Sequence, residues 1–417
     1  MRIDKVLKSL LPLMLFVALD GYAQTNNNIV IGKIDTIYSA TLHEKRRIWV
    51  HLPGNGTAPF FNSQRYPVIY LLDGDAHFAS VMGMIQQLSE INGNALCPQM
   101  ILVGIPNTDR MRDLTPTHSG SNAYVDSNAI RTAGGGESFT TFLEKELIPH
   151  IDSLYPTAPY RMLIGHSLGG LMVINTLIHH QYLFNAYLAI DPSLWWDNQK
   201  LLHQAETTLG RERFNGRSLF LAVANTMQPG MDTAHVHADT AASTWHIRSI
   251  LDFVGTLKRN KDNGLHWNYK YYDEDGHSSV PLIAEYDALR YLFNYYNLPS
   301  INRFFDSSYT AEQAVSTITQ HYQEISRQMG YTVLPPEFTV NGLGYAFLQR
   351  KMPEKAEAFF KLNISNYPRS NNAFDSMGDF YNTTGDRKKA IECYTKALSI
   401  GEYADTRRKL ENLKAEK

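Results

Sequence analysis

The stretch RMLIGHSLGGLMVINTL, residues 161–177, decides the fold. A short apolar run leads into Gly165, and a helix-like run begins directly after Ser167. A serine on a sharp turn between a strand and a helix needs neighbours without bulky side chains, and Gly165 and Gly169 meet that need. Such a turn lifts the serine hydroxyl above the carboxyl end of a sheet, where the N-terminus of the next helix faces it. The stretch therefore predicts a strand–turn–helix unit that carries a nucleophilic serine.

Strand-like and helix-like segments alternate on both sides of this unit. Continuous apolar runs, typical of strands buried on both faces, occur at 66–75, 100–107, 186–193 and 218–225. Alternating patterns at 28–52 and 266–277 predict further strands, and helical stretches such as 138–155 and 282–296 lie between the runs. Strands that alternate with helices predict an α/β fold, with a mainly parallel central sheet and helices on both faces.

A different pattern follows residue 298. Residues 342–368 and 376–402 align at an offset of 34, which matches Gly344 with Gly378 and Phe360 with Tyr394. This period is that of tetratricopeptide repeats, in which small residues let paired helices approach and aromatic residues fill the gaps. We predict an α/β domain over 24–298, a helical linker over 299–335, and a small all-α domain of tetratricopeptide-like repeats over 336–417.

The first 23 residues have the pattern of a secretory signal peptide: a basic start, an apolar core at 9–19 and a small-x-small site ending at Ala23. We therefore expect a periplasmic or secreted protein. No later stretch predicts a membrane span, and the net charge of −2 gives no basic surplus for binding nucleic acid. The two cysteines, Cys97 and Cys393, predict neither a disulfide framework nor a cysteine metal site.

Serine is a weak nucleophile at neutral pH and needs a base. His277 lies in the polar turn DEDGHSSVP, residues 273–281, after the last strand-like segment, and we expect its imidazole to reach Ser167. The acid that orients such a base should follow the preceding strand, which favours Asp232 over its main alternative, Asp191. A Ser–His dyad without an acid stays open. The less favoured carboxylates are Asp239, Asp273 and Glu274.

An acyl-transfer site also needs two backbone donors for the developing oxyanion. One should be the N–H of Leu168, directly after the serine. The other should come from the turn that ends VIYLLDGD, residues 68–75, either Gly74 or, by preference, Asp75.

Five segments together resemble the esterase D and enterochelin-esterase family of α/β-hydrolases: VIYLLDGD, GIPNTDRMRDLTPT, IGHSLGG, DPSLWWDN and DGHSSVP, spread over residues 28–298. The resemblance implies an α/β-hydrolase fold with Ser167 as nucleophile, His277 as base and Asp75 as an oxyanion donor. Many relatives have serine where Asp191 stands, which argues against Asp191 as an indispensable acid. The whole arrangement is similar to secreted Bacteroidetes hydrolases that carry trailing tetratricopeptide repeats.

Arg110 and Arg112 follow a predicted core strand, on the side of the sheet where substrates bind. We expect Arg110 to contact an anionic or catecholic substrate, and the alternative is an ion pair with Asp109 or Asp113.

Trp195 and Trp196 are expected to line an acyl or sugar pocket, with a packing role as the alternative. His235 and His237 have metal-like spacing, but no third ligand is evident, so we expect no metal and no cofactor.

The sequence thus predicts a serine hydrolase that cleaves carboxylic esters through an acyl-enzyme. The family resemblance implies siderophore esters, such as enterobactin, or feruloyl and acetyl esters of polysaccharides as substrates. One alternative is an acyltransferase on the same scaffold, and the other is a binding or assembly module that uses the helical repeats. The repeats could also bind a protein partner or a second copy of the chain.

Overall fold

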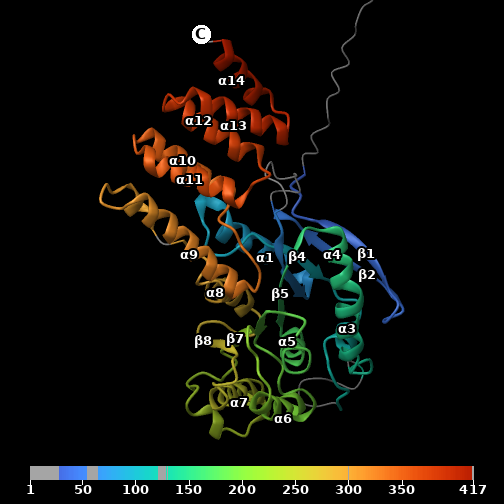
Figure 1. The fold of residues 1–417 in the computed structure, drawn as a ribbon. Coiled ribbons are helices and arrows are strands. Elements are labelled where there is room, and N and C mark those ends of the chain that lie inside the picture. The colour runs from blue at the N-terminus through green and yellow to red at the C-terminus, as the bar shows by residue number, and fades with distance from the viewer. Residues whose placement is uncertain (1–27, 54–63, 121–127, 129, 299, 416–417) are drawn as a thin grey trace, which may run out of the picture. The chain divides into compact units, whose positions relative to one another are not determined.

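The structure is a computed structural model that describes residues 28–53, 64–120, 128, 130–298 and 300–415. The predicted signal peptide lies outside the described residues. The chain divides into two units, 1–31 and 32–417, and the second contains all the described helices and strands (Figure 1).

Eight strands form one sheet in the order β1-β2-β4-β3-β5-β6-β7-β8. β1 pairs antiparallel with β2, and β2 pairs antiparallel with β4, whereas all other neighbours are parallel. The predicted α/β fold with a mainly parallel sheet is therefore confirmed. The strands are β1 (Lys33–Ser39), β2 (Glu44–His51), β3 (Tyr66–Leu72), β4 (Ile101–Ile105), β5 (Thr157–His166), β6 (Ala186–Ile190), β7 (Ser218–Ala224) and β8 (His266–Tyr272).

The continuous apolar runs form the central strands. Every residue of β3, β4 and β6 is buried, as expected of strands covered by helices on both faces. β8 lies at the edge of the sheet and alternates between exposed and partly buried residues along most of its length, which matches its alternating sequence.

Helices cover both faces of the sheet (Figure 1). Buried apolar side chains form one layer on each face. Tyr70 of β3 points into the layer that α3 to α7 cover, and its neighbour Leu71 points into the opposite layer, which α1 and α8 cover. The helices are α1 (Gly74–Ser89), α2 (Arg110–Asp113), α3 (Gly136–Phe142), α4 (Ile148–Leu154), α5 (Leu168–His179), α6 (Trp196–Arg211), α7 (Trp245–Arg259) and α8 (Val280–Leu292). A π-helical turn, Leu143–Leu147, joins α3 to α4, and short 3-10 turns lie at Ile91–Gly93, Val236–Ala238, Ala242–Thr244 and Asn302–Phe305.

The rest of the described chain is helical, as predicted. Its members are α9 (Ala311–Met329), α10 (Glu337–Gln349), α11 (Pro353–Asn366), α12 (Asn371–Thr383), α13 (Arg387–Ile400) and α14 (Ala404–Ala415). α10 packs on α11, and α12 packs on α13. A Cβ added to Gly344 would meet the ring of Phe360 at 2.7 Å, and one added to Gly378 would meet Tyr394 at 2.5 Å. The residues matched by the repeat therefore make equivalent contacts. The tetratricopeptide assignment and the boundaries at 298 and 335 stay predictions.

Among the described helices, none is both long and apolar enough to cross a membrane.

Candidate active site

Ser167 occupies the turn between β5 and α5 with φ 59° and ψ −115°, a strained conformation for a residue with a side chain. A Cβ on Gly165 would lie 2.4 Å from the carbonyl carbon and oxygen of Gly169, so only glycine lets α5 start so close to β5. The Ser167 N–H donates to the carbonyl of Ile190 at 2.9 Å, and its own carbonyl accepts the N–H of Ser193 at 3.0 Å. The Ser167 hydroxyl lies 3.3 Å from that of Ser193. The turn is thus fastened to the end of β6.

His277 is hydrogen-bonded to a fully buried carboxylate. Its Nδ1 lies 2.6 Å from Oδ2 of Asp191, and the second oxygen, Oδ1, accepts the N–H of Ala224 at 3.0 Å. Burial alone would raise the pKa of Asp191, but interactions with His246 and His277 outweigh it and hold that pKa well below the usual value. Because the ionised carboxylate of Asp191 accepts a hydrogen bond from the Nδ1–H of His277, Nε2 of His277 is the nitrogen left to accept a proton.

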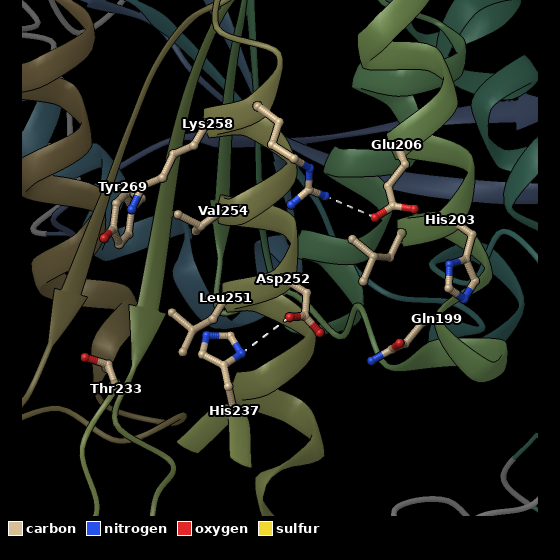
Figure 2. A pocket seen from close by; sticks show the side chains of 13 residues that line it. Gln199, His203, Glu206, Thr233, His237, Leu251, Asp252, Val254, Lys258 and Tyr269 are labelled. Carbon is tan, nitrogen blue, oxygen red and sulfur yellow. Dashed lines mark hydrogen bonds and ion pairs between the residues drawn. The ribbon is translucent and has the colours of Figure 1, made fainter. Parts of the chain in front are cut away.

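Asp232, the carboxylate that we expected on His277, lies elsewhere. Its carboxylate accepts hydrogen bonds from Nδ1 of His235 at 2.8 Å and from the backbone N–H of Ala234 at 2.9 Å. Its side chain is 61% exposed. The adjacent Thr233 lines a cavity of about 590 Å³ between α6 and α7, and neither the candidate serine nor the candidate base lines that cavity (Figure 2). The expectation of an Asp232–His277 contact is therefore corrected. The loop after β7 turns toward solvent, and Asp191, the alternative, occupies the position.

His166, the residue before the candidate serine, brings the two loops together. Its ring centroid lies 4.5 Å from that of His277, and its Nε2 is 2.8 Å from the His277 carbonyl oxygen. Burial, together with the neighbouring His277 ring, lowers the pKa of His166 to about 4. At neutral pH His166 is therefore uncharged and donates its Nε2–H to that carbonyl.

The two expected oxyanion donors lie at helix starts. Leu168 is the first residue of α5 and Asp75 the second of α1, and N–H groups in a first turn have no acceptor within their own helix. The two starts lie close together, because a Cβ on Gly169 would be 3.2 Å from Oδ2 of Asp73. Asp73 has a left-handed backbone, with φ 51°, where β3 turns into α1.

Arg110, which we expected to contact substrate, makes hydrogen bonds to this turn, and its contact with substrate stays a prediction. Its Nε and Nη2 donate to the carboxylate of Asp73 at 2.6 and 2.9 Å, and Nη2 also reaches the His166 carbonyl at 3.3 Å. Asn107 donates to Asp73 at 2.7 Å and to Asp75 at 3.3 Å. Burial would raise the pKa of Asp73, but the hydrogen bonds from Arg110 keep it below the usual value. We call the contacts of Arg110 with Asp73 and with the His166 carbonyl the clamp, because together they tie the start of α1 to the end of β5.

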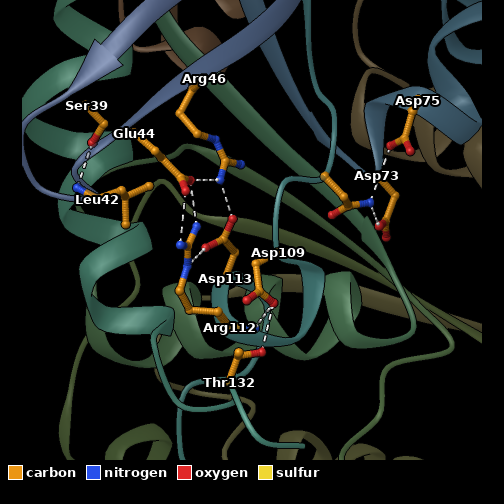
Figure 3. Close-up of polar contacts among 11 residues, drawn as sticks. Ser39, Leu42, Glu44, Arg46, Asp73, Asp75, Asp109, Arg112, Asp113 and Thr132 are labelled. Carbon is orange, nitrogen blue, oxygen red and sulfur yellow. Dashed lines mark hydrogen bonds and ion pairs between the residues drawn. The ribbon is translucent and has the colours of Figure 1, made fainter. Parts of the chain in front are cut away.

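Arg112 belongs to a separate network of charges. It donates to Glu44 at 2.7 Å and to Asp113 at 2.7 Å, and the buried Arg46 contacts the same two carboxylates (Figure 3). This network joins β2 to α2. Arg112 therefore forms an ion pair with Asp113, which is the alternative that we gave to a substrate contact.

Trp195 and Trp196 are both buried, with 6% and 2% of their surface exposed. The Trp196 indole donates to the carbonyl of Thr117 at 2.8 Å, and the Trp195 ring packs against Trp245. Their contacts favour the packing alternative over the expected role in lining a substrate pocket.

The His235–His237 pair does not gather metal ligands among the described residues. His235 contacts Asp232, and His237 lies 3.5 Å from Asp252. The described group with ligand-like spacing is Asp191, His246 and His277, whose donor atoms lie within 4.8 Å of one another.

The sequence reasoning missed the partner that shares Asp191. Nε2 of His246 lies 2.8 Å from the same Oδ2 that His277 contacts. The one sequence signal for His246 is its place at the start of a helical stretch. The chain has fourteen other histidines, so this signal does not single it out. The sequence gives a clearer signal for the clamp, because Asp73 and Arg110 each lie at or just after the end of a predicted strand.

A serine on a strained strand–helix turn, followed at the same end of the sheet by a His–Asp pair whose loop contacts the residue before that serine, is typical of serine hydrolases with an α/β-hydrolase fold. The family model described as "Putative esterase" matches residues 39–237, and the chain belongs to this esterase family. It is a carboxylic ester hydrolase, as predicted.

Three similar proteins illustrate the relationship. Ferri-bacillibactin esterase BesA of Bacillus subtilis is 26% identical over 283 residues, which cover 64% of this chain and 92% of the relative. The crystal structure of an IroE-like serine hydrolase from Shewanella oneidensis shares 31% identity with a TM-score of 0.66, over 80% of this chain and 98% of the other. An uncharacterised protein from Capnocytophaga ochracea has the same fold at 18% identity and a TM-score of 0.58, over 92% of this chain and 99% of the other.

Proposed function

We propose that the protein hydrolyses the ester bonds of a siderophore outside the cytoplasm, with Ser167 as nucleophile, His277 as base and Asp191 as the orienting acid. The observation that carries the mechanism is the 2.6 Å contact between Nδ1 of His277 and the buried Asp191, on a loop that His166 fastens beside the strained serine. The similarity to BesA, a ferri-bacillibactin esterase, supports the substrate class.

The reaction uses the chain's own groups. The Ser167 hydroxyl passes its proton to Nε2 of His277 while Oγ bonds to the ester carbonyl carbon. The N–H groups of Leu168 and Asp75 stabilise the resulting oxyanion, and Asp191 stabilises the imidazolium. When the ester C–O bond breaks, His277 returns the proton to the leaving alcohol. Water then attacks the acyl-enzyme by the same route and releases the acid.

The nucleophile is tested with Ser167→Ala and, as its matched control, Ser193→Ala, which removes the neighbouring hydroxyl. On p-nitrophenyl acetate we expect Ser167→Ala to lose about 10⁴-fold or more in kcat, and Ser193→Ala to lose less than about tenfold. A fluorophosphonate probe should label the wild type on Ser167. Labelling on Ser193, or full activity of Ser167→Ala, contradicts the mechanism.

The substrate class is tested by comparing kcat/KM on a ferric tris-catecholate trilactone, a feruloylated arabinose ester and acetylated xylan. We expect the trilactone to be preferred at least about 100-fold, since about 2.7 kcal/mol of differential transition-state binding is enough for that ratio. A preference for either polysaccharide ester refutes the siderophore proposal but leaves the hydrolase mechanism standing. Transfer of the acyl group to an added alcohol in preference to water would instead favour an acyltransferase.

The location is tested separately. We expect the natural chain, expressed in a Gram-negative host, to appear in the periplasmic fraction with an N-terminus near Gln24. Recovery of the full-length chain from the cytoplasm would contradict the proposed location.

A further inference from the structure

A second histidine contacts the carboxylate that orients the candidate base. His246 lies in the first turn of α7, its residue is 8% exposed, and its Nε2 is 2.8 Å from Oδ2 of Asp191. The same oxygen is 2.6 Å from Nδ1 of His277. The two imidazoles meet at right angles, with an interplanar angle of 90° and centroids 5.1 Å apart.

The shared oxygen follows from where the acid stands in the sheet. Asp191 follows β6, whereas His277 follows β8, and β7 lies between them. The Asp191 side chain therefore crosses the end of β7, where the Ala224 N–H holds Oδ1 at 3.0 Å. The backbone of Asp191 is itself left-handed, with φ 41°. The contact with His246 gives Oδ2 a second hydrogen-bond partner besides His277.

The backbone that carries His246 is held in place independently of that carboxylate. Thr244, at the start of α7, donates to Asp239 at 2.8 Å, and the hydroxyl of Ser249 donates to the His246 carbonyl at 2.7 Å. Its ring is thus presented to Asp191 by a helix start that is fixed by its own hydrogen bonds.

We propose that His246 is a positioning residue, which acts through Asp191 by donating Nε2–H to Oδ2 and so fixes the direction in which that oxygen accepts from His277. The inference rests on the proposed function. His246 touches neither the serine nor the ester in this role, and its effect passes entirely through the carboxylate.

The role predicts a graded response to two substitutions. His246→Gln keeps an N–H donor at similar reach, and we expect its kcat to stay within about threefold of wild type. His246→Leu keeps volume but removes the donor, and we expect kcat to fall about 10- to 100-fold while KM changes less than about twofold. The matched control is His235→Leu, which removes the exposed partner of Asp232 and should leave both constants unchanged.

A double-mutant cycle separates positioning from a packing role. If His246 acts through Asp191, adding His246→Leu to Asp191→Asn should lower kcat by less than about twofold further. Titration of sites with a fluorophosphonate normalises kcat to folded enzyme, and the thermal unfolding midpoint of each variant is recorded alongside. Equal losses in the Gln and Leu variants, or a multiplicative loss in the double variant, overturn the inference, and so does a Leu variant with wild-type kcat.

The outcomes also keep the inference apart from the proposed function. An active Ser167→Ala variant means that the proposed mechanism fails. An inactive Ser167→Ala variant beside a fully active His246→Leu variant means that only the role of His246 fails.

Discussion

Breaking the clamp should damage both stability and catalysis. Asp73 is 6% exposed, and its carboxylate receives two hydrogen bonds from Arg110, at 2.6 and 2.9 Å. Among the described residues, Arg110→Ala leaves that buried charge with Asn107 as its remaining side-chain hydrogen-bond donor. Removing one partner of a buried pair costs about 3–5 kcal/mol, and we expect the lower end, about 3 kcal/mol, because the Arg110 side chain is 36% exposed.

Catalysis should fall as well, because the clamp sets where the N–H of Asp75 stands relative to that of Leu168. Losing one oxyanion donor costs about 10²- to 10³-fold in kcat, and a displaced donor should cost a substantial part of that range. Urea unfolding followed by circular dichroism measures the stability, and hydrolysis of p-nitrophenyl acetate measures kcat. Arg327→Ala, which breaks an exposed pair with Glu324, is the control and should cost less than about 0.5 kcal/mol.

The loss should depend on pH in a stated direction. The folded-state pKa of Asp73 lies below its usual value, so in the wild type this stabilisation is present above pH about 4 and is lost as the pH falls through the lower folded value. Without Arg110, burial raises that pKa, and the folded variant takes up a proton as the pH falls. The difference in unfolding free energy between wild type and Arg110→Ala should therefore shrink from pH 7 to pH 5. An Arg110→Ala variant with wild-type kcat and stability would refute the reasoning.

Three further outcomes follow from the site and its surroundings. Asp191→Asn should lower kcat by about 10⁴-fold on p-nitrophenyl acetate, whereas Asp232→Asn should leave it within about twofold, and the reverse order would restore Asp232 as the acid. Gly165→Ala should abolish activity and lower stability by more than about 3 kcal/mol in urea unfolding because its Cβ meets α5, whereas Gly83→Ala, in open space on α1, should stabilise by about 0.5–1 kcal/mol. Burial raises the pKa of Glu285 to about 8, so wild-type stability should fall as the pH rises from about 4.5 to 8. In the Glu285→Gln variant we expect the fall in unfolding free energy over this pH range to be smaller by up to about 4 kcal/mol. Identical pH profiles of unfolding free energy for wild type and variant would contradict this.

The sheet and the serine turn could be predicted from the sequence because their causes are local. A strand buried on both faces must be apolar throughout, and the approach of α5 to β5 demands glycine at 165. His277 could be proposed because the loop after the last strand opens at the same edge of the sheet as Ser167. Its contact with His166 agrees with that reasoning.

The acid could not be chosen in the same way. Both Asp191 and Asp232 follow strands, and the sequence does not show how far a side chain reaches across the 4.8 Å or so that separates neighbouring strands. The roles of Arg110 and of the two tryptophans depend on which partner each side chain meets in space, and that is set by packing rather than by periodicity. His246 lay beyond prediction for the same reason.

The hydrogen bond from His166 ends on the main chain of His277, not on its ring. The loop that carries the base is therefore anchored by its peptide backbone, whatever side chain residue 277 bears. Replacing the imidazole of residue 277 with a different functional group would therefore keep this contact. The loop could then hold a new catalytic group in the same position, for a reaction that the natural enzyme does not perform.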